Sequence, residues 1–201
     1  MLVTEIKDLK NGKHRVFLDN GLQFVLYRKE LGMYQIKEAV ELTEEIYREI
    51  CSQILLKRAE KRLLFLLQKM DRTRKQLWQK LTLDGYPEAV IEDAIAYVEH
   101  YHYVDDLRYA TTYIRYHQKQ KSKRDLIHTL LQRGVSKDTT ELAIESCYEG
   151  REEELLYRLL EKRHYDSEQA DLKEKKRVYA YLMRKGFSPD MILYCMEHKS
   201  D

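Results

Sequence analysis

The feature that most constrains the fold of this chain is a glycine that returns about every fifty residues in similar surroundings. Gly85, Gly134 and Gly186 lie 49 and 52 residues apart. Each has a leucine four residues before it, an apolar or aromatic residue directly after it, and then Pro or Ser. A fixed period of this size is the mark of a repeat protein, in which each copy is one supersecondary unit. Such a protein presents an extended surface instead of enclosing a catalytic pocket.

Each repeat is predicted to hold three helices, because apolar residues keep helical spacing between the breaks. The glycine suits the left-handed end of the second helix, and Pro87, Ser136 or Ser188 then opens the third. When the copies are aligned on the glycine, three positions hold core-type residues in every copy. They are Leu77, Leu126 and Val178 at the first position, Ala94, Ala143 and Cys195 at the second, and Ile95, Ile144 and Met196 at the third. We therefore interpret Cys195 as a small core residue.

The expected fold is mainly α, with tandem three-helix repeats in an elongated array. The expected helices are 57–70, 73–84 and 87–101 in the first repeat, 106–119, 122–133 and 137–149 in the second, and 151–163, 168–185 and 189–198 in the third. The expected segments are an N-terminal part at 1–42, a helical lead-in with the first repeat at 43–104, and the further repeats at 105–150 and 151–201. Thr43 is a plausible N-cap of the lead-in helix, and a short break is expected near Ser52.

Residues 1–28 differ from the rest of the chain. Apolar and polar residues alternate in three short runs, which are separated by Asn11-Gly12 and by Asp19-Asn20-Gly21. This pattern predicts a three-stranded antiparallel β meander. A sheet of three strands needs a cover for its apolar face, and residues 29–42 are expected to supply it.

The composition limits the class of protein and its location. Seven Gly and two Pro beside 35% charged residues are typical of helices with short connections. No apolar run approaches the roughly 18 residues of a membrane span, and the first residues do not form a secretion signal. Three widely spaced cysteines fit a reducing compartment. We expect a cytoplasmic monomer without membrane contact.

The net charge of +2 hides an alternation that follows the repeats. Residues 57–80 hold nine Lys and Arg against two acidic residues, whereas 81–106 hold seven acidic residues and no Lys or Arg. Residues 107–137 hold eight basic residues and one acidic, and 138–154 hold seven acidic and one basic. In an array this alternation would form one basic and one acidic face.

The motifs of enzymes and cofactor sites are missing from the sequence. His100 and His102 lie two residues apart at a helix end, and Cys195 and His198 have no second pair at zinc-finger spacing. No Gly-rich phosphate loop and no nucleophile elbow occurs. We therefore expect no catalytic residue, no metal and no cofactor.

Basic residues interleaved with tyrosines are the candidate binding site. Such a pattern suits phosphate backbones as well as acidic protein surfaces, although a purely solubilising role explains any single helix equally well. The candidate residues are Arg108, Arg115, Lys119, Lys121, Lys123 and Arg124 in the second repeat and Arg72, Arg74 and Lys75 in the first.

A block at the start of the second repeat carries a family resemblance. It consists of Tyr103, Asp105, Asp106, Tyr109 and Ala110, followed by Tyr113-Ile114-Arg115. Either aspartate would also serve as an N-cap, so the block has a sufficient structural role. Together with the tandem Leu-x-x-x-Gly repeats and the N-terminal strands, this block resembles the RecX family of RecA regulators over essentially the whole chain. The third repeat departs from the pattern, because its first helix lacks the Asp-Asp entry.

The resemblance implies a non-enzymatic regulator that binds the filament of the recombinase RecA. Members of the family suppress strand exchange, ATP turnover and the coprotease activity that triggers the SOS response. The partner would then be the RecA filament, with at most weak contact to DNA. The alternative is a helical repeat protein that binds nucleic acid without RecA, and a structural adaptor is a third reading.

Overall fold

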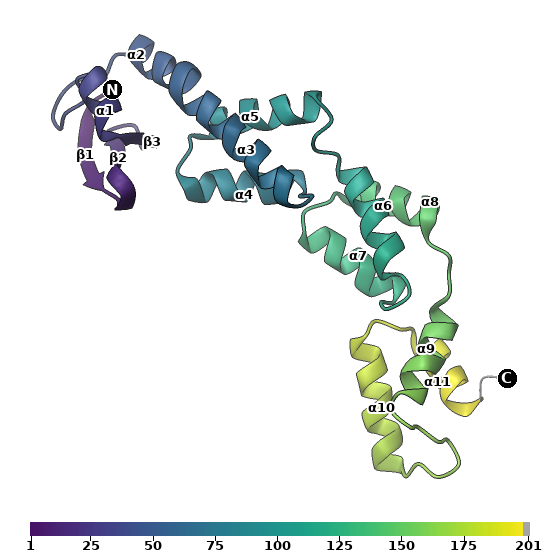
Figure 1. Cartoon of the computed structure of the whole chain (residues 1–201). Coiled ribbons are helices and arrows are strands. Elements are labelled where there is room, and N and C mark those ends of the chain that lie inside the picture. Colours follow the sequence, from purple (N-terminus) through teal and green to yellow (C-terminus); the bar gives the residue numbers. More distant parts are fainter. Residues whose placement is uncertain (199–201) are drawn as a thin grey trace. The chain divides into compact units, whose positions relative to one another are not determined.

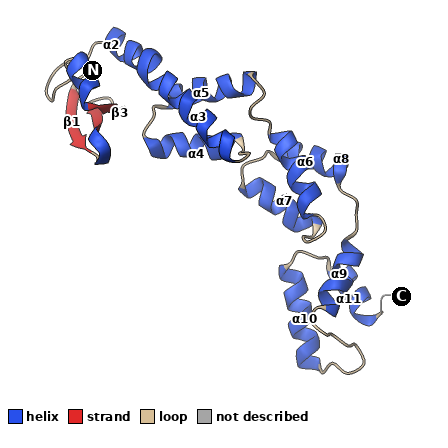
Figure 2. Ribbon diagram, viewed as in Figure 1, coloured by secondary structure: helices blue, strands red, loops and turns tan. Residues whose placement is uncertain are grey.

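The computed structural model describes residues 1–198. The chain forms two compact units, Met1–Asp105 and the residues from Asp106 onward. Strands occur at the start of the first unit, and every later element is helical (Figures 1 and 2). The predicted mainly α fold with an N-terminal sheet is confirmed.

The sheet is an antiparallel meander of β1 (Val3–Asp8), β2 (Lys13–Leu18) and β3 (Gln23–Tyr27). In its register Val16 lies opposite Ile6 on one side and Phe24 on the other. Asn11 and Gly12 both have positive φ, as the predicted turn between the first two strands requires.

One face of this sheet is the apolar face that the alternation predicts. Val16, Leu18, Phe24 and Leu26 are buried there. The segment after β3 forms the short helix α1 (Arg28–Met33) and contributes the buried Ile36 and Leu42. The lead-in helix adds to the cover, since the ring of Tyr47 lies 5.7 Å from that of Phe24.

The lead-in helix is continuous, so the expected break near Ser52 is wrong. Thr43 caps it by accepting a hydrogen bond from the backbone N–H of Ile46 at 3.3 Å. The helix then runs through α2 (Glu44–Glu49), a π-helical segment (Ile50–Leu56) and α3 (Lys57–Lys69). A π-helical segment takes up extra residues without ending the helix, which is why the local pattern looked interrupted.

In each three-helix domain the first helix packs against the third. The three helices follow one another along the chain as the repeat predicts. The helices are α3, α4 (Arg74–Asp84) and α5 (Glu88–His100) in the first domain, α6 (Asp106–His117), α7 (Lys123–Gln132) and α8 (Lys137–Cys147) in the second, and α9 (Glu152–Glu161), α10 (Leu172–Arg184) and α11 (Pro189–Glu197) in the third (Figure 1).

The repeat glycines and core positions have the predicted roles. Gly85, Gly134 and Gly186 have φ of +86°, +90° and +88°, a conformation that costs other residues energy. Ser136 and Ser188 cap the helices that follow them. All nine aligned core residues are buried, and Cys195 is 2% exposed beside Val178 and Met196.

The third domain departs most from its expected boundaries. α10 starts at Leu172 and not at residue 168, because Asp171 accepts a hydrogen bond from the N–H of Glu174 at 2.7 Å and so caps the helix there. Asp166 instead holds a turn, since its carboxylate accepts from the N–H of Glu168 at 2.9 Å. The last residues of the segment predicted at 151–201 lie outside the described range.

Candidate partner-binding surface

The basic candidates of the second domain lie where α6 passes into α7. The backbone N–H of Gln118 donates to the carbonyl oxygen of Ile114 at 2.8 Å, and that of Lys121 donates to His117 at 3.0 Å. Ser122 then caps α7, since its Oγ accepts from the N–H of Asp125 at 3.1 Å. These bonds fix the turn that carries the lysines.

Three of these cations are exposed to solvent with their charge uncompensated. Arg115, Lys119 and Arg124 are exposed, and none of them forms an ion pair with another described residue. Tyr116 lies next to Arg115 and is 77% exposed. Such a combination of free cations and an aromatic ring is suited to phosphate or carboxylate groups on a partner.

Lys121 and Lys123 have contacts within the protein. The ammonium group of Lys121 lies 3.1 Å from a carboxylate oxygen of Asp125 and 3.4 Å from the hydroxyl of Thr129. The ammonium group of Lys123 lies 5.9 Å from the ring centroid of Tyr148. Lys121 therefore has a structural role that its sequence position does not reveal.

Residues of the third domain form hydrogen bonds with the same turn. Arg158 of α9 donates from Nη1 to the carbonyl oxygen of Lys119 at 3.2 Å. The N–H of Lys123 donates to Oε1 of Glu152 at 2.8 Å, and Ser122 donates to the carbonyl oxygen of Lys185 at 2.7 Å. Sequence reasoning missed the contacts of Ser122, Glu152, Arg158 and Lys185, because no local pattern joins positions this far apart.

In the first domain the charges of the candidates are less available. Arg74 forms ion pairs with Glu92 at 2.6 Å and with Glu99 at 3.1 Å, both on α5. Arg72 is half-buried, and only Lys75 is exposed without an ion pair to a described residue. Arg74, one of the basic residues behind the charge alternation, is thus paired with carboxylates of its own domain. Arg108, the remaining candidate, is exposed on the first turn of α6.

The residues of the Tyr103–Ala110 block lie around the start of α6, of which Asp106 is the first residue. Ala110 is fully buried in the core of the second domain. The hydroxyl of Tyr109 accepts a hydrogen bond from the guanidinium group of Arg133. Tyr103 is half exposed, and Asp105 precedes the helix at the N-cap position.

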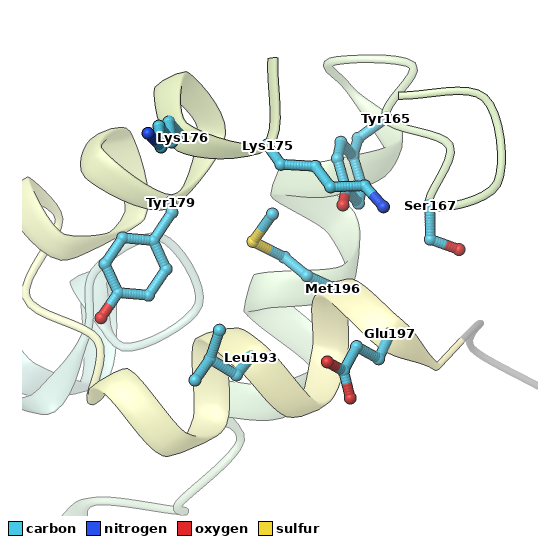
Figure 3. Close-up of a pocket in the computed structure, with 8 residues that line it drawn as sticks. All are labelled: Tyr165, Ser167, Lys175, Lys176, Tyr179, Leu193, Met196 and Glu197. Atoms are coloured by element: carbon cyan, nitrogen blue, oxygen red, sulfur yellow. The ribbon is translucent and has the colours of Figure 1, made fainter. Parts of the chain in front are cut away.

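The third domain contains a cavity of about 500 Å³ (Figure 3). Leu193 and Met196 of α11 and Tyr179 of α10 give it an apolar side, whereas Lys175 and Tyr165 lie at a polar end. Burial first, and then the neighbouring carboxylates of Glu174, Asp166 and Glu197, raise the pKa of Tyr165. Its phenol therefore stays protonated at neutral pH, so that it can donate a hydrogen bond but not act as a base.

Within residues 1–198 no group of three or more His, Cys, Asp or Glu side chains is placed to hold a metal ion. In the same part of the chain no helix is long and apolar enough to cross a membrane. Fold and surface together define a helical repeat protein, in which three three-helix domains follow a small sheet and the second domain presents exposed cations.

Comparison with known proteins identifies the family. The chain matches the first three-helix domain of RecX over residues 59–97, the second over 105–144 and the third over 151–196. A regulatory protein RecX of Caldanaerobacter subterraneus subsp. tengcongensis is 33% identical over 96% of each chain. Another from Bacillus pumilus is 27% identical over 99% of this chain and 78% of its own length. The chain belongs to the RecX family.

Solved structures agree on the fold. A crystal structure of a regulatory protein RecX superposes with a TM-score of 0.65 at 23% identity, covering 98% of this chain and 99% of that one. The crystal structure of RecX from Lactobacillus salivarius gives a TM-score of 0.61 at 23% identity, over 71% of this chain and 94% of its own.

Proposed function

We propose that this protein is a non-enzymatic regulator that binds the RecA filament and inhibits its recombination, ATPase and coprotease activities in the cytoplasm. Through this inhibition it modulates DNA repair and the SOS response. The observation that carries the proposal is the match of all three helical domains to RecX domains. The relatives bear the name of regulatory proteins, which fits binding and not catalysis.

The contact surface proposed for RecA is the exposed basic turn of the second domain. Arg115, Lys119 and Arg124 supply charges that no described residue of the chain neutralises. The expectation that the domains follow one another in an elongated array belongs to this proposal, because each domain could then contact a different protomer of the filament. Modest contacts that are linked in this way sum to useful avidity.

The test is a charge reversal on this surface. The variant Arg115→Glu/Lys119→Glu/Arg124→Glu should retain the helical circular dichroism of the wild type but lose inhibition of the DNA-dependent ATPase of RecA. The matched control is Lys162→Glu/Lys173→Glu/Arg184→Glu, which changes the charge equally on exposed positions of the third domain. The control should still inhibit. Equal inhibition by both variants would remove the assignment of the surface.

The second candidate function is binding of nucleic acid without RecA, which the exposed Tyr116 among these cations favours. A salt titration separates the two functions. Tight binding of bare single-stranded DNA with a log–log slope of several units supports the second candidate. Weak binding of bare DNA beside strong binding of RecA filaments supports the regulator.

A further inference from the structure

A second cavity, of about 370 Å³, lies in the first unit between the sheet and the first three-helix domain. Its walls come from three places in the chain. Lys13 and Tyr27 belong to the sheet, Arg58, Lys61 and Arg62 to α3, and Asp84–Tyr86 to the turn between α4 and α5. It involves none of the residues of the basic turn.

The sequence builds this cavity from the second face of the sheet. Lys13 lies opposite Tyr27 in the register and Arg15 lies opposite Val25, so these side chains alternate with the buried Val16. Gly85 closes the floor. With φ of +86° it turns the chain toward the sheet, where a Cβ would stand 2.7 Å from Cγ2 of Val25.

Positive charge exceeds negative charge around the cavity. Arg62 pairs with Asp84 at 2.8 Å, and Arg58 pairs with Glu30. Lys13 and Lys61 form no ion pair with any residue in the described range. The two lysines therefore remain as uncompensated cations in the lining, one on a strand and one on a helix.

A further donor lies beside the floor. The Nη2 atom of Arg15 is 3.6 Å from the position that a Cβ would take on Gly85. The Nε atom of Arg15 is buried and has no hydrogen-bond acceptor among the described residues. Arg15 is not among the residues that line the cavity, so its guanidinium group adds positive charge behind the cavity wall.

The cations of the cavity are suited to phosphate. Arg58 and Arg62 already hold Glu30 and Asp84, whereas Lys13 and Lys61 hold no carboxylate among the described residues. Lysine binds phosphate as a point charge. Burial is the main cause that raises the pKa of Tyr86 to about 12, so this lining residue stays neutral and does not repel an anion.

The lining favours a single strand. The volume falls in the range of small-ligand pockets, about 300–1,000 Å³. A cationic groove with aromatic walls is the usual form of a site for single-stranded nucleic acid. We propose that this cavity binds a backbone phosphate of single-stranded nucleic acid between Lys13 and Lys61.

The experiment measures binding of a fluorescent oligothymidylate to the full chain in the absence of RecA. Lys13→Ala/Lys61→Ala should bind roughly tenfold more weakly than the wild type, and its log–log salt slope should fall by about 0.7 for each lysine that contacts a phosphate. The matched control Lys69→Ala/Lys80→Ala removes two exposed lysines of α3 and α4 outside the cavity, and it should keep the wild-type slope.

Three results would overturn the proposal. They are an unchanged affinity of the Lys13/Lys61 variant, an equal loss in the control, and loss of binding to polyglutamate with no loss for the oligonucleotide. The last result would assign the cavity to an acidic protein segment. The exposed single variant Lys61→Ala guards against a folding defect of the double variant. Inhibition of RecA is measured separately, so that failure of the regulatory function is distinguishable from failure of this site.

Discussion

The hydroxyl of Ser122 donates a hydrogen bond to the carbonyl oxygen of Lys185, 63 residues later in the chain, at 2.7 Å. The Oγ atom of Ser122 also accepts a hydrogen bond from the N–H of Asp125 at 3.1 Å. A serine hydroxyl has one hydrogen to donate and two lone pairs, so both bonds can exist together. Ser122 is 1% exposed, and it thereby joins the cap of α7 to the end of α10 in the next domain.

Ser122→Ala is expected to destabilise the protein more than the loss of a helix cap alone. The matched variant is Ser136→Ala, because Ser136 caps α8 through the N–H of Thr139 at 3.1 Å from an exposed position. Ser136→Ala should cost about 1 kcal/mol. Ser122→Ala should cost about 1 kcal/mol more, since the hydrogen bond to the carbonyl oxygen of Lys185 is lost as well. Urea unfolding measures both, and equal losses would contradict a role of Ser122 between the domains.

Gly186→Ala should be more harmful than alanine at a glycine with open surroundings. Both Gly186 and Gly150 have positive φ, at +88° and +75°. A Cβ on Gly186 would stand 2.7 Å from Oγ of Ser122, whereas nothing lies within 4 Å at Gly150. Gly150→Ala should therefore cost about 1 kcal/mol from backbone strain alone. Gly186→Ala should cost roughly 1 kcal/mol more than Gly150→Ala, because the added methyl group overpacks the contact with Ser122. Unfolding midpoints that coincide for the two variants would refute this difference.

The repeat glycines show which features of the fold could be predicted from the sequence. The left-handed conformation of Gly85, Gly134 and Gly186 was predictable, because it depends on neighbours within one helical turn. The close approach of Gly186 to Ser122 was not, since it depends on packing between segments far apart in the sequence. The π-helical segment Ile50–Leu56 was missed for a different reason, namely that apolar periodicity does not separate a π turn from a break.

The candidate site was predictable as a set of charges but not as a set of available charges. Arg74 and Lys119 look alike in the sequence, yet Arg74 pairs with Glu92 and Glu99, and Lys119 has no such partner among the described residues. Counting residues gives the sign of a surface, whereas pairing across helices decides which cations a partner can reach.

Substitutions of Lys121 and Lys119 should have different effects, the first on stability and the second on inhibition of RecA. Lys121→Ala removes the ion pair with Asp125 and the contact with Thr129, and it should lower the free energy of unfolding by about 0.5 kcal/mol. The loss should shrink at high salt, because added ions already weaken a half-exposed pair. Lys119→Ala should leave stability unchanged and weaken inhibition of RecA. Denaturation at two salt concentrations beside an ATPase assay checks both, and the reverse pattern would contradict the assignment.

His117 should make the stability of the second domain depend on pH. Its ring lies 4.3 Å from that of Tyr113, and burial first, then the charges of Lys121 and Arg133, lower its pKa below the ordinary histidine value of about 6.5. Below that pH the unfolded chain takes up a proton more readily than the folded one. The stability that depends on the neutral ring is therefore complete above about pH 6.5 and is lost as the pH falls through the lowered folded pKa.

The substitution His117→Gln should accordingly flatten the fall of the unfolding free energy between neutral and mildly acidic pH. Lys121→Ala provides a second check, because removal of one neighbouring cation should raise the pKa of His117 toward the ordinary value. A histidine titration followed by NMR measures that pKa directly. A pKa of His117 at or above the ordinary value of about 6.5 would show that burial and the two cations do not disfavour its charged form.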